Sequence, residues 1–212
     1  MNGLPQPIDS GIRLGLVAAL AVAALAAVFN LTRGPIAEQE RQAELASLNA
    51  ALPADLYDND ILADSIEVVA PEFLGNAQPH KVYRGRKNGE PSALAIRATA
   101  PDGYNGPIEL LIGLRANGEL TGVRVISHRE TPGIGDKIDL RVTDWLLSFD
   151  GRSLGDPPAE RWTVAPDGGA FEAFSGATIT PRAVVKQVRR TLEYYSENRE
   201  SLFARPAEPS DG

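Results

Sequence analysis

An uncharged apolar stretch near the N-terminus constrains this chain more than any other feature. Residues 14–32, LGLVAALAVAALAAVFNLT, place nineteen uncharged residues between Arg13 and Arg33. As a helix rising ~1.5 Å per residue the stretch spans roughly 28 Å, close to the ~30 Å hydrocarbon core of a bilayer. The sequence therefore predicts a transmembrane anchor over 14–32, preceded by a short N-terminal segment, 1–13.

The alternative to an anchor is a cleaved signal peptide, because Ala-Leu-Ala and Ala-Val-Ala triplets provide small-residue cleavage sites. The stretch is long for the apolar region of a signal peptide, and a predicted helix follows it directly. We therefore favour an uncleaved anchor. Cleavage would instead leave a soluble domain.

Small residues recur every four positions in the predicted anchor, a spacing used where transmembrane helices pack closely. An alanine-rich helix also produces such a stripe by chance, so both interpretations stay open. The charges do not settle the orientation, because Arg13 on one side is nearly balanced by Arg33 and Arg41 on the other. The stripe consists of Gly15, Ala19, Ala23 and Ala27.

A helical stalk is predicted over residues 33–55. Pro35 suits a first helical position, and the helix is expected to end before Pro53. Its apolar face comprises Ile36, Leu45, Leu48 and Leu52. The stalk would connect the anchor to a main domain.

The main domain, residues 56–205, is predicted to be α+β: a mainly antiparallel sheet with helices, including a long C-terminal one. Asn-Gly pairs at 88–89 and 117–118 indicate two hairpins. The expected strands are Ser65–Ala70, Lys81–Arg86, Ala93–Thr99, Ile108–Leu114 and Leu120–Ser127, and the expected helices are Asp139–Phe149 and Thr180–Leu202. The tail, 206–212, is rich in Pro, Asp and Ser and is expected to be disordered.

Composition excludes several function classes. The net charge of −7 and the pI of about 4.9 argue against nucleic-acid binding. The chain has no cysteine and only two histidines, His80 and His128. It therefore lacks thiolate ligands for iron–sulfur clusters, and we expect no metal site. Redox chemistry would need an organic cofactor.

Residues 171–185, FEAFSGATITPRAVV, gather three hydroxyls at a predicted helix start. Thr180 is a good N-cap and Pro181 suits the first helical position. Thr178 lies outside that helix beside Gly176 and Ala177, so its hydroxyl should be accessible. A helix N-terminus attracts anions, and Arg182 and Lys186 could add charge. On the residues alone, both a plain capping turn and a phosphate attachment point remain open.

Two other segments give weaker signals. Residues 129–137, RETPGIGDK, place Gly133 and Gly135 between a predicted strand and a predicted helix, but they match neither a dinucleotide-binding nor a Walker A motif. Ser175 lies in Ala-Phe-Ser-Gly-Ala rather than in the Gly-x-Ser-x-Gly of hydrolase nucleophiles. Only His80 or His128 could serve as its base, so acyl transfer is disfavoured.

The segments together resemble one protein family. The matching runs are Leu-Pro-Ala at 52–54 with Tyr-Asp-Asn at 57–59, ATAPDGY at 98–104, SHRETPGIGDKI at 127–138, Asp-Trp at 144–145, and SGATIT at 175–180 with Arg-Ala-Val-Val behind it. With the N-terminal anchor, they resemble the G subunit of the Rnf (Rsx) ion-translocating electron-transport complex. They are similar also to the C subunit of the sodium-translocating NADH:quinone reductase.

This resemblance implies a covalently bound FMN. In the family, the flavin phosphate is esterified to the threonine that follows Gly-Ala, here Thr178, within a motif that covers Ser175, Gly176, Ala177 and Thr180. A separate Mg²⁺-dependent flavin transferase attaches it from FAD. The resemblance also places the loop containing Glu130 and Thr131 near the flavin. The usual motif has Asp three residues before the serine, where this chain has Glu172.

The resemblance further implies an inner-membrane, single-pass protein with a cytoplasmic N-terminus and a periplasmic flavin domain. Its partners would be the other membrane, iron–sulfur and flavin subunits of a complex that couples electron transfer between ferredoxin and NAD to ion movement. In this role the chain is an electron carrier, and no residue need be an acid–base catalyst.

One alternative function remains at this stage. The chain could be a membrane-anchored binding or assembly module without a cofactor.

Four aromatic residues are candidates to stack on the flavin ring, although each could equally be a core residue. They are Tyr104, Trp145, Trp162 and Phe174.

Overall fold

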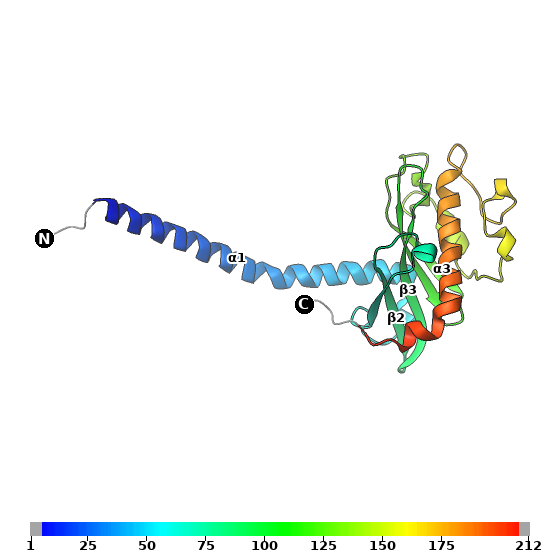
Figure 1. Ribbon diagram of the computed structural model, residues 1–212, viewed down its shortest axis with the longest axis horizontal. Coiled ribbons are helices and arrows are strands. Elements are labelled where there is room, and N and C mark those ends of the chain that lie inside the picture. The colour runs from blue at the N-terminus through cyan, green and yellow to red at the C-terminus, as the bar shows by residue number, and fades with distance from the viewer. Residues whose placement is uncertain (1–5, 208–212) are drawn as a thin grey trace. The chain divides into compact units, whose positions relative to one another are not determined.

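The computed structural model describes residues 6–207, with side chains from residue 14 onward. The first five residues of the expected cytoplasmic segment and residues 208–212 of the expected disordered tail lie outside this range. The chain divides into two compact units between Ala46 and Ser47. The first consists of helix alone, and the second contains the sheet and the other helices (Figure 1).

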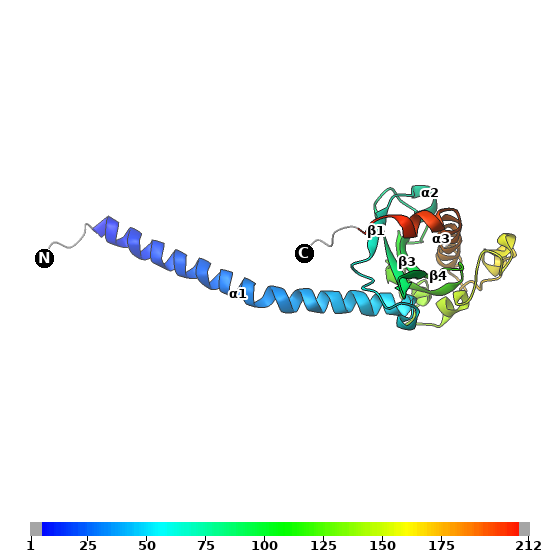
Figure 2. The same cartoon turned by 90° about the horizontal axis from the view of Figure 1, so that it is seen from below.

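Helix α1 (Gln6–Ala51) runs without interruption through the predicted anchor and stalk. Pro35 therefore lies inside a helix and not at the start of one, so the predicted break is wrong. A proline inside a helix removes one backbone hydrogen bond and favours bending, and α1 is visibly bent (Figures 1 and 2). The helix is continuous because alanine- and leucine-rich sequence propagates it on both sides of the proline.

The apolar part of α1 is long and hydrophobic enough to cross a membrane, and none of it is buried in the first unit. Its two polar side chains bond back to helix carbonyls. Asn30 Nδ2 donates to Ala26 O at 2.9 Å, and Thr32 Oγ1 donates to Val28 O at 2.8 Å. Such bonds satisfy polar donors where lipid offers no partner. These features are consistent with a single-pass anchor.

The second unit is built on a five-stranded antiparallel sheet with strands in sequence order. The two-residue turn between β2 and β3 places Asn88 and Gly89 at φ 54° and 82°, as a tight hairpin requires. This confirms the first predicted hairpin. A longer turn at 116–119 joins the two strands of the second predicted hairpin, β4 and β5. The strands are β1 (Ser65–Val68), β2 (His80–Lys87), β3 (Glu90–Ala100), β4 (Ile108–Arg115) and β5 (Leu120–Ser127).

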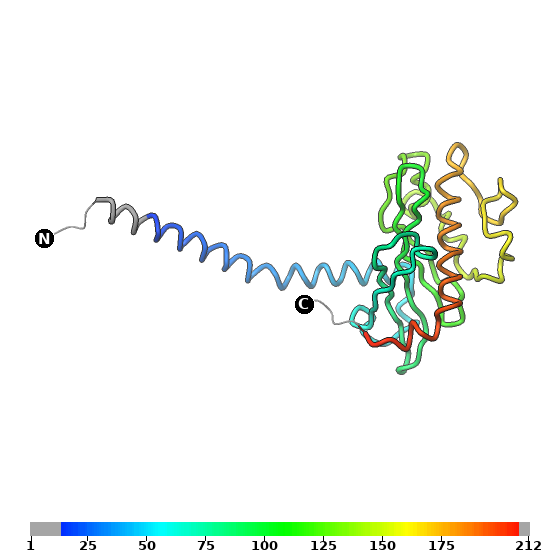
Figure 3. The backbone as a smooth tube through the Cα atoms, viewed as in Figure 1, coloured from blue at the N-terminus to red at the C-terminus, as the bar shows by residue number. Residues whose placement is uncertain are grey.

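Helix α3 (Ile179–Ala204) lies across one face of the sheet (Figures 1–3). Its apolar stripe, which includes Val184, Val188 and Leu192, packs on inward-facing residues of β3 and β4. The short helix α2 (Pro71–Leu74) packs against α3 as well. The α+β class and the long C-terminal helix are therefore confirmed.

The predicted helix over 139–149 is wrong in its first half. Only Trp145–Phe149 is helical, as a short 3-10 helix. The preceding residues form turns in which side chains bond to the backbone. Asp139 Oδ1 accepts the Arg141 N–H at 2.9 Å, and Thr143 Oγ1 donates to Lys137 O at 2.6 Å. Such local bonds compete with helical ones.

The last turn of α1 belongs to the second unit and packs on the sheet face opposite α3. Leu48, Ala51 and Leu52 are buried there, and Thr121 Oγ1 donates to Ala51 O at 2.7 Å. A Cβ on Gly113 would lie only 2.2 Å from Ala51 O. The domain thus begins before residue 56, because the end of the predicted stalk is part of its core.

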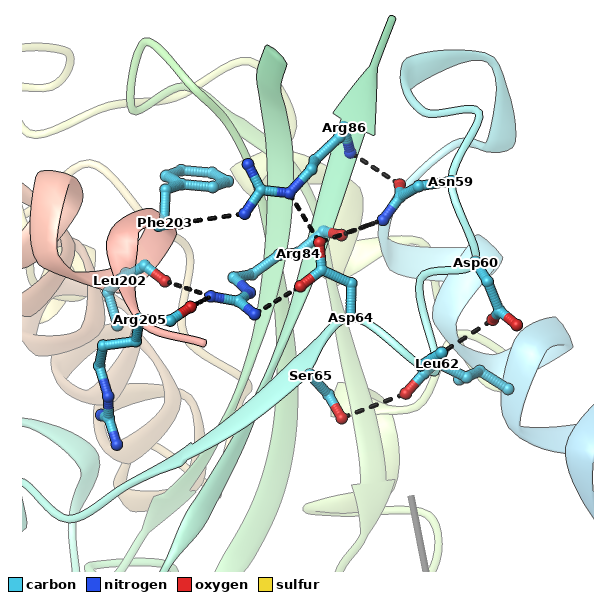
Figure 4. A network of polar contacts seen from close by, with 11 residues as sticks. Asn59, Asp60, Leu62, Asp64, Ser65, Arg84, Arg86, Leu202, Phe203 and Arg205 are labelled. Carbon is cyan, nitrogen blue, oxygen red and sulfur yellow. Dashed lines mark hydrogen bonds and ion pairs between the residues drawn. The ribbon is translucent and has the colours of Figure 1, made fainter. Parts of the chain in front are cut away.

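Two arginines of β2 hold the C-terminal end of α3 in what we call the arginine latch: Asp64, Arg84 and Arg86 (Figure 4). Arg84 is 1% exposed and pairs with Asp64 at 2.5 Å, and Arg86 Nε reaches the same carboxylate at 2.7 Å. Cations favour a helix C-terminus, where carbonyls lack partners. The latch donates to the carbonyls of Leu202, Phe203 and Arg205.

Candidate functional site

A cavity of about 430 Å³ lies at the N-terminal end of α3. It brings together the loop after β5 and the turn before α3, which sequence analysis treated as separate signals. Of the predicted site residues, all but Ser175 line it. The lining residues are Tyr104, Glu130, Thr131, Ile134, Gly135, Gly176, Ala177, Thr178, Ile179 and Thr180.

A tight turn leads into this cavity from the preceding loop. The Ala177 N–H donates to Phe174 O at 3.0 Å, and Gly176 takes a positive φ of 79°, which glycine adopts without steric cost. Ser175 and Gly176 are exposed at the tip. Nothing lies within 4 Å of where a Cβ on Gly176 would stand. Positive φ, not crowding, explains the glycine.

Helix α3 begins two residues earlier than predicted, so Thr178 and not Thr180 occupies the N-cap position. Thr178 occupies the N-cap position but makes no side-chain capping hydrogen bond. Thr180 lies within the first turn, and Pro181 is the third helical residue. Thr180 is therefore not the N-cap. The reason is tertiary: its hydroxyl donates to Glu130 Oε2, and the residue is only 1% exposed.

Thr178 and Thr180 consequently differ in accessibility and in bonding. Thr178 is half-buried on the cavity wall, and its hydroxyl makes no hydrogen bond within the described part of the chain. The Thr180 hydroxyl is buried and engaged. Of the two hydroxyl groups, that of Thr178 is the one that is accessible from the cavity and not engaged in a hydrogen bond.

Glu130, which also lines the cavity, is a buried carboxylate that is 4% exposed. Besides the Thr180 hydroxyl, it accepts the Asn105 N–H at Oε1, 3.1 Å away. Its own N–H donates to His128 Nδ1 at 3.1 Å. The adjacent Thr131 accepts from Asn105 Nδ2 through its hydroxyl at 2.9 Å. The loop is thus fixed to the turn after β3.

The cations expected to assist a phosphate are already paired. Arg182 bonds Asp167 at 2.6 and 2.9 Å, and Lys186 bonds Asp102 at 2.5 Å. The hydrogen bond from Arg182 holds the pKa of Asp167 below its ordinary value. The anion-attracting groups that remain at this end are the backbone N–H groups of the first turn, to which Pro181 contributes none.

The four aromatic residues that were candidates to stack on a flavin differ in burial. Tyr104 lines the cavity and is 67% exposed. Trp162 and Phe174 are buried in the core. Trp145 is half-buried, with its Nε1–H donated to Glu172 O at 2.9 Å.

Sequence reasoning missed two apolar residues of the cavity. Ile134 and Ile179 are large side chains that stay 47% and 45% exposed. With Tyr104 they form what we call the apolar rim. The available signal was an isoleucine between two glycines in the 133–135 run.

Neither histidine serves Ser175. His128 Nδ1 accepts the Glu130 N–H, and His80 Nε2 bonds Asn76 Oδ1 at 3.1 Å. Burial lowers the pKa of His80, more than the nearby Glu109 raises it. Across residues 6–207 there is no group of three or more His, Cys, Asp or Glu side chains able to hold a metal.

The chain matches two known families. Residues 103–193, which include every cavity residue, match the FMN-binding domain, and residues 5–50 match the RnfG N-terminal region. The match to the FMN-binding domain thus covers both walls of the cavity. The N-terminal match covers the apolar helix and the stalk.

Curated relatives match along nearly the whole chain. The G subunit of the ion-translocating oxidoreductase complex of Vibrio atlanticus (strain LGP32) is 47% identical over 197 residues, covering 93% of this chain and 94% of the relative. The corresponding protein of Pseudomonas aeruginosa (strain UCBPP-PA14) is 46% identical, covering 93% and 92%. The crystal structure of Shewanella oneidensis NqrC superimposes with a TM-score of 0.46 at 23% identity, covering 74% of this chain and 73% of that one.

The family models and the two G-subunit relatives confirm the resemblance to the G subunit inferred from the sequence motifs. The chain belongs to the family of G subunits of ion-translocating oxidoreductase complexes and contains an FMN-binding domain.

Proposed function

We propose that this chain carries FMN covalently on Thr178 through a phosphoester and relays electrons within its complex. The observation that carries the proposal is the contrast between two neighbouring hydroxyls on one cavity wall: Thr180 is buried and bonded to Glu130, whereas Thr178 makes no capping bond. Family membership supports FMN as the cofactor, and this contrast supports Thr178 Oγ1 as the attachment atom.

The cavity and the residues that line it fit an FMN. The volume of the cavity, about 430 Å³, lies within the usual range for small-molecule sites. The apolar rim, Tyr104, Ile134 and Ile179, offers surface to a flat aromatic ring. A phosphodiester carries one negative charge, which the N–H groups at the start of α3 favour without a free cation.

Attachment would require no redox step. The Thr178 hydroxyl attacks the flavin-side phosphorus of FAD, a new Oγ1–P bond forms, the pyrophosphate bond breaks, and AMP and a proton leave. A separate flavin transferase would catalyse this. Glu172 is exposed three residues before Ser175, so its carboxylate is accessible to that enzyme despite being one methylene longer than Asp.

The chain's own residues would hold and orient the flavin. Gly176 permits the tight turn that presents Thr178, the apolar rim excludes water from one side, and the first turn of α3 faces the phosphate. When bound, FMN supplies the redox chemistry by accepting and passing electrons. We assign no acid–base catalytic residue and no metal.

We further propose that α1 anchors the protein in the inner membrane with its N-terminus in the cytoplasm and the flavin domain in the periplasm. A covalent tether is useful there because a dissociating flavin would be lost. Absence of cysteine avoids stray disulfides in that oxidising compartment. Alkaline phosphatase fused after Arg205 should be active; activity only in fusions to the N-terminus would reverse the topology.

The deciding experiment is co-expression with a flavin transferase, followed by a denaturing gel under ultraviolet light and intact-mass measurement. The wild-type band should fluoresce and carry the added mass of FMN. Thr178→Val should lose both, whereas Thr178→Ser and Ser175→Ala should keep them. Flavin retained by Thr178→Val would place the attachment elsewhere.

A dark wild-type band with the bare polypeptide mass would favour the alternative, a cofactor-free assembly module. N-terminal sequencing of the membrane fraction addresses the other alternative. An intact N-terminus supports the anchor, and a shortened chain outside the membrane would indicate signal-peptide cleavage.

A further inference from the structure

The Glu130 carboxylate joins two walls of the cavity. One oxygen accepts the N–H of Asn105, in the turn after β3, and the other accepts the hydroxyl of Thr180, in the first turn of α3. These segments are 75 residues apart in sequence (180 − 105). A single side chain therefore sets the spacing between the turn after β3 and the helix that follows Thr178.

Glycines lie close to both oxygens of this carboxylate. A Cβ on Gly135 would lie 2.9 Å from Oε2, and one on Gly103 would lie 3.1 Å from Oε1. Neither glycine has a positive φ, so close approach rather than backbone geometry accounts for both. Gly135 thus leaves room for Glu130, whereas a Cβ on Gly103 would meet Gly106 O first, at 2.2 Å.

Glu130 also lacks a cationic partner. It forms no ion pair with any residue in the described part of the chain, although it is 4% exposed. Both of its bonds use its oxygens as acceptors. Buried charges are usually paired, so an unpaired one in a cavity wall is unusual.

We propose that Glu130 is the positioning residue of the flavin cavity and that its unpaired negative charge lowers the reduction potential of the bound flavin. The proposal rests on the proposed function above. Reduction adds negative charge to the ring system, and a fixed negative charge in a poorly solvated wall opposes that addition. The hydrogen bonds fix the wall, and the charge adjusts the potential.

Glu130→Gln separates these two contributions. The glutamine oxygen can accept the Asn105 N–H while its amide donates to the Thr180 oxygen, so both bonds persist without the charge. Glu130→Leu removes bonds and charge together. Glu193→Gln, in a surface pair with Arg189 on α3, is the matched control for losing one carboxylate outside the cavity.

The measurements use full-length flavinylated protein in detergent: intact mass, fluorescence anisotropy of the flavin, and midpoint potential by redox titration. We expect Glu130→Gln to keep the wild-type mass and anisotropy and to titrate at a more positive potential. Glu130→Leu should keep the mass but lose anisotropy, because the ring is held less firmly. Glu193→Gln should match wild type in all three.

An unchanged potential in Glu130→Gln would overturn the proposal, and this holds even if the Leu variant fails to fold. A similar positive shift in Glu193→Gln would overturn it too, since the effect would then be general. Absence of flavin mass in wild type is a different failure, because it would remove the proposed function itself and the inference with it.

Discussion

Gly113 on β4 lies directly opposite Gly122 on β5, and the carbonyl of Ala51 rests against this pair. A Cβ on Gly113 would meet Ala51 O at 2.2 Å, and one on Gly122 would meet it at 3.0 Å. The two glycines therefore let the backbone of the last turn of α1 approach the sheet closely. The Thr121 hydroxyl beside the pair donates to the same carbonyl.

Gly113→Ala should therefore destabilise the domain by about 1–3 kcal/mol, because the added methyl displaces a packed backbone. Gly122→Ala should cost less, since its contact is longer. Urea unfolding followed by circular dichroism measures both. Gly155→Ala is the control, because nothing lies within 4 Å of its Cβ position, and an equal loss there would remove the explanation.

Truncation should show where the folded domain begins. A chain that starts at Ser47 retains Leu48 and Leu52, each almost fully buried, and should unfold cooperatively. A chain that starts at Pro53 lacks them and should lose about 3 kcal/mol or more, at roughly 1.5–3 kcal/mol per buried leucine. Equal urea midpoints for the two chains would show that this turn contributes nothing.

The arginine latch should be sensitive to losing one partner. Arg84→Met removes one of the two arginines that bond Asp64 and leaves the carbonyls of Leu202 and Arg205 without their Arg84 donor. Removing one member of a buried pair costs about 3–5 kcal/mol. Arg182→Met, which breaks an exposed pair, should have little effect. Thermal melts compare the two variants, and comparable losses would contradict the distinction.

Stability should fall in mild acid because of His80. Burial lowers its pKa below the ordinary 6.5, so the unfolded chain binds a proton more readily than the folded one. The contribution of neutral His80 to the free energy of unfolding is complete above about pH 6.5. It is lost progressively as the pH falls from there toward the pKa of His80 in the folded state. His80→Gln should flatten the free energy of unfolding across this window, and an unchanged slope would exclude His80 as the source.

Sequence alone predicted the elements whose signals are local. The Asn88-Gly89 turn and the alternating strands around it were visible because the hairpin φ angles and the two-residue period act at short range. The anchor was equally visible as an uncharged run. Thr178 as the attachment residue, inferred from its neighbours and from family resemblance together, stays a prediction.

The remaining errors depend on contacts across the chain. Thr180 had every local property of an N-cap, but a buried carboxylate fifty residues earlier offered its hydroxyl another acceptor. The burial of Glu130 was invisible in the same way, because its contacts with Asn105, Gly135 and Thr180 form only on folding. Pro35 failed as a helix start because the strongly helical sequence around it continued through.

The exposed turn at Ser175 and Gly176 bears on the order of maturation. Because Ser175 and Gly176 are exposed in the folded domain, a modifying enzyme can contact this turn without unfolding the domain. Under the proposed function, export, folding and cofactor loading then become separable events. A cell short of flavin would accumulate folded, empty subunits that are ready to be loaded later, and not misfolded ones destined for proteolysis.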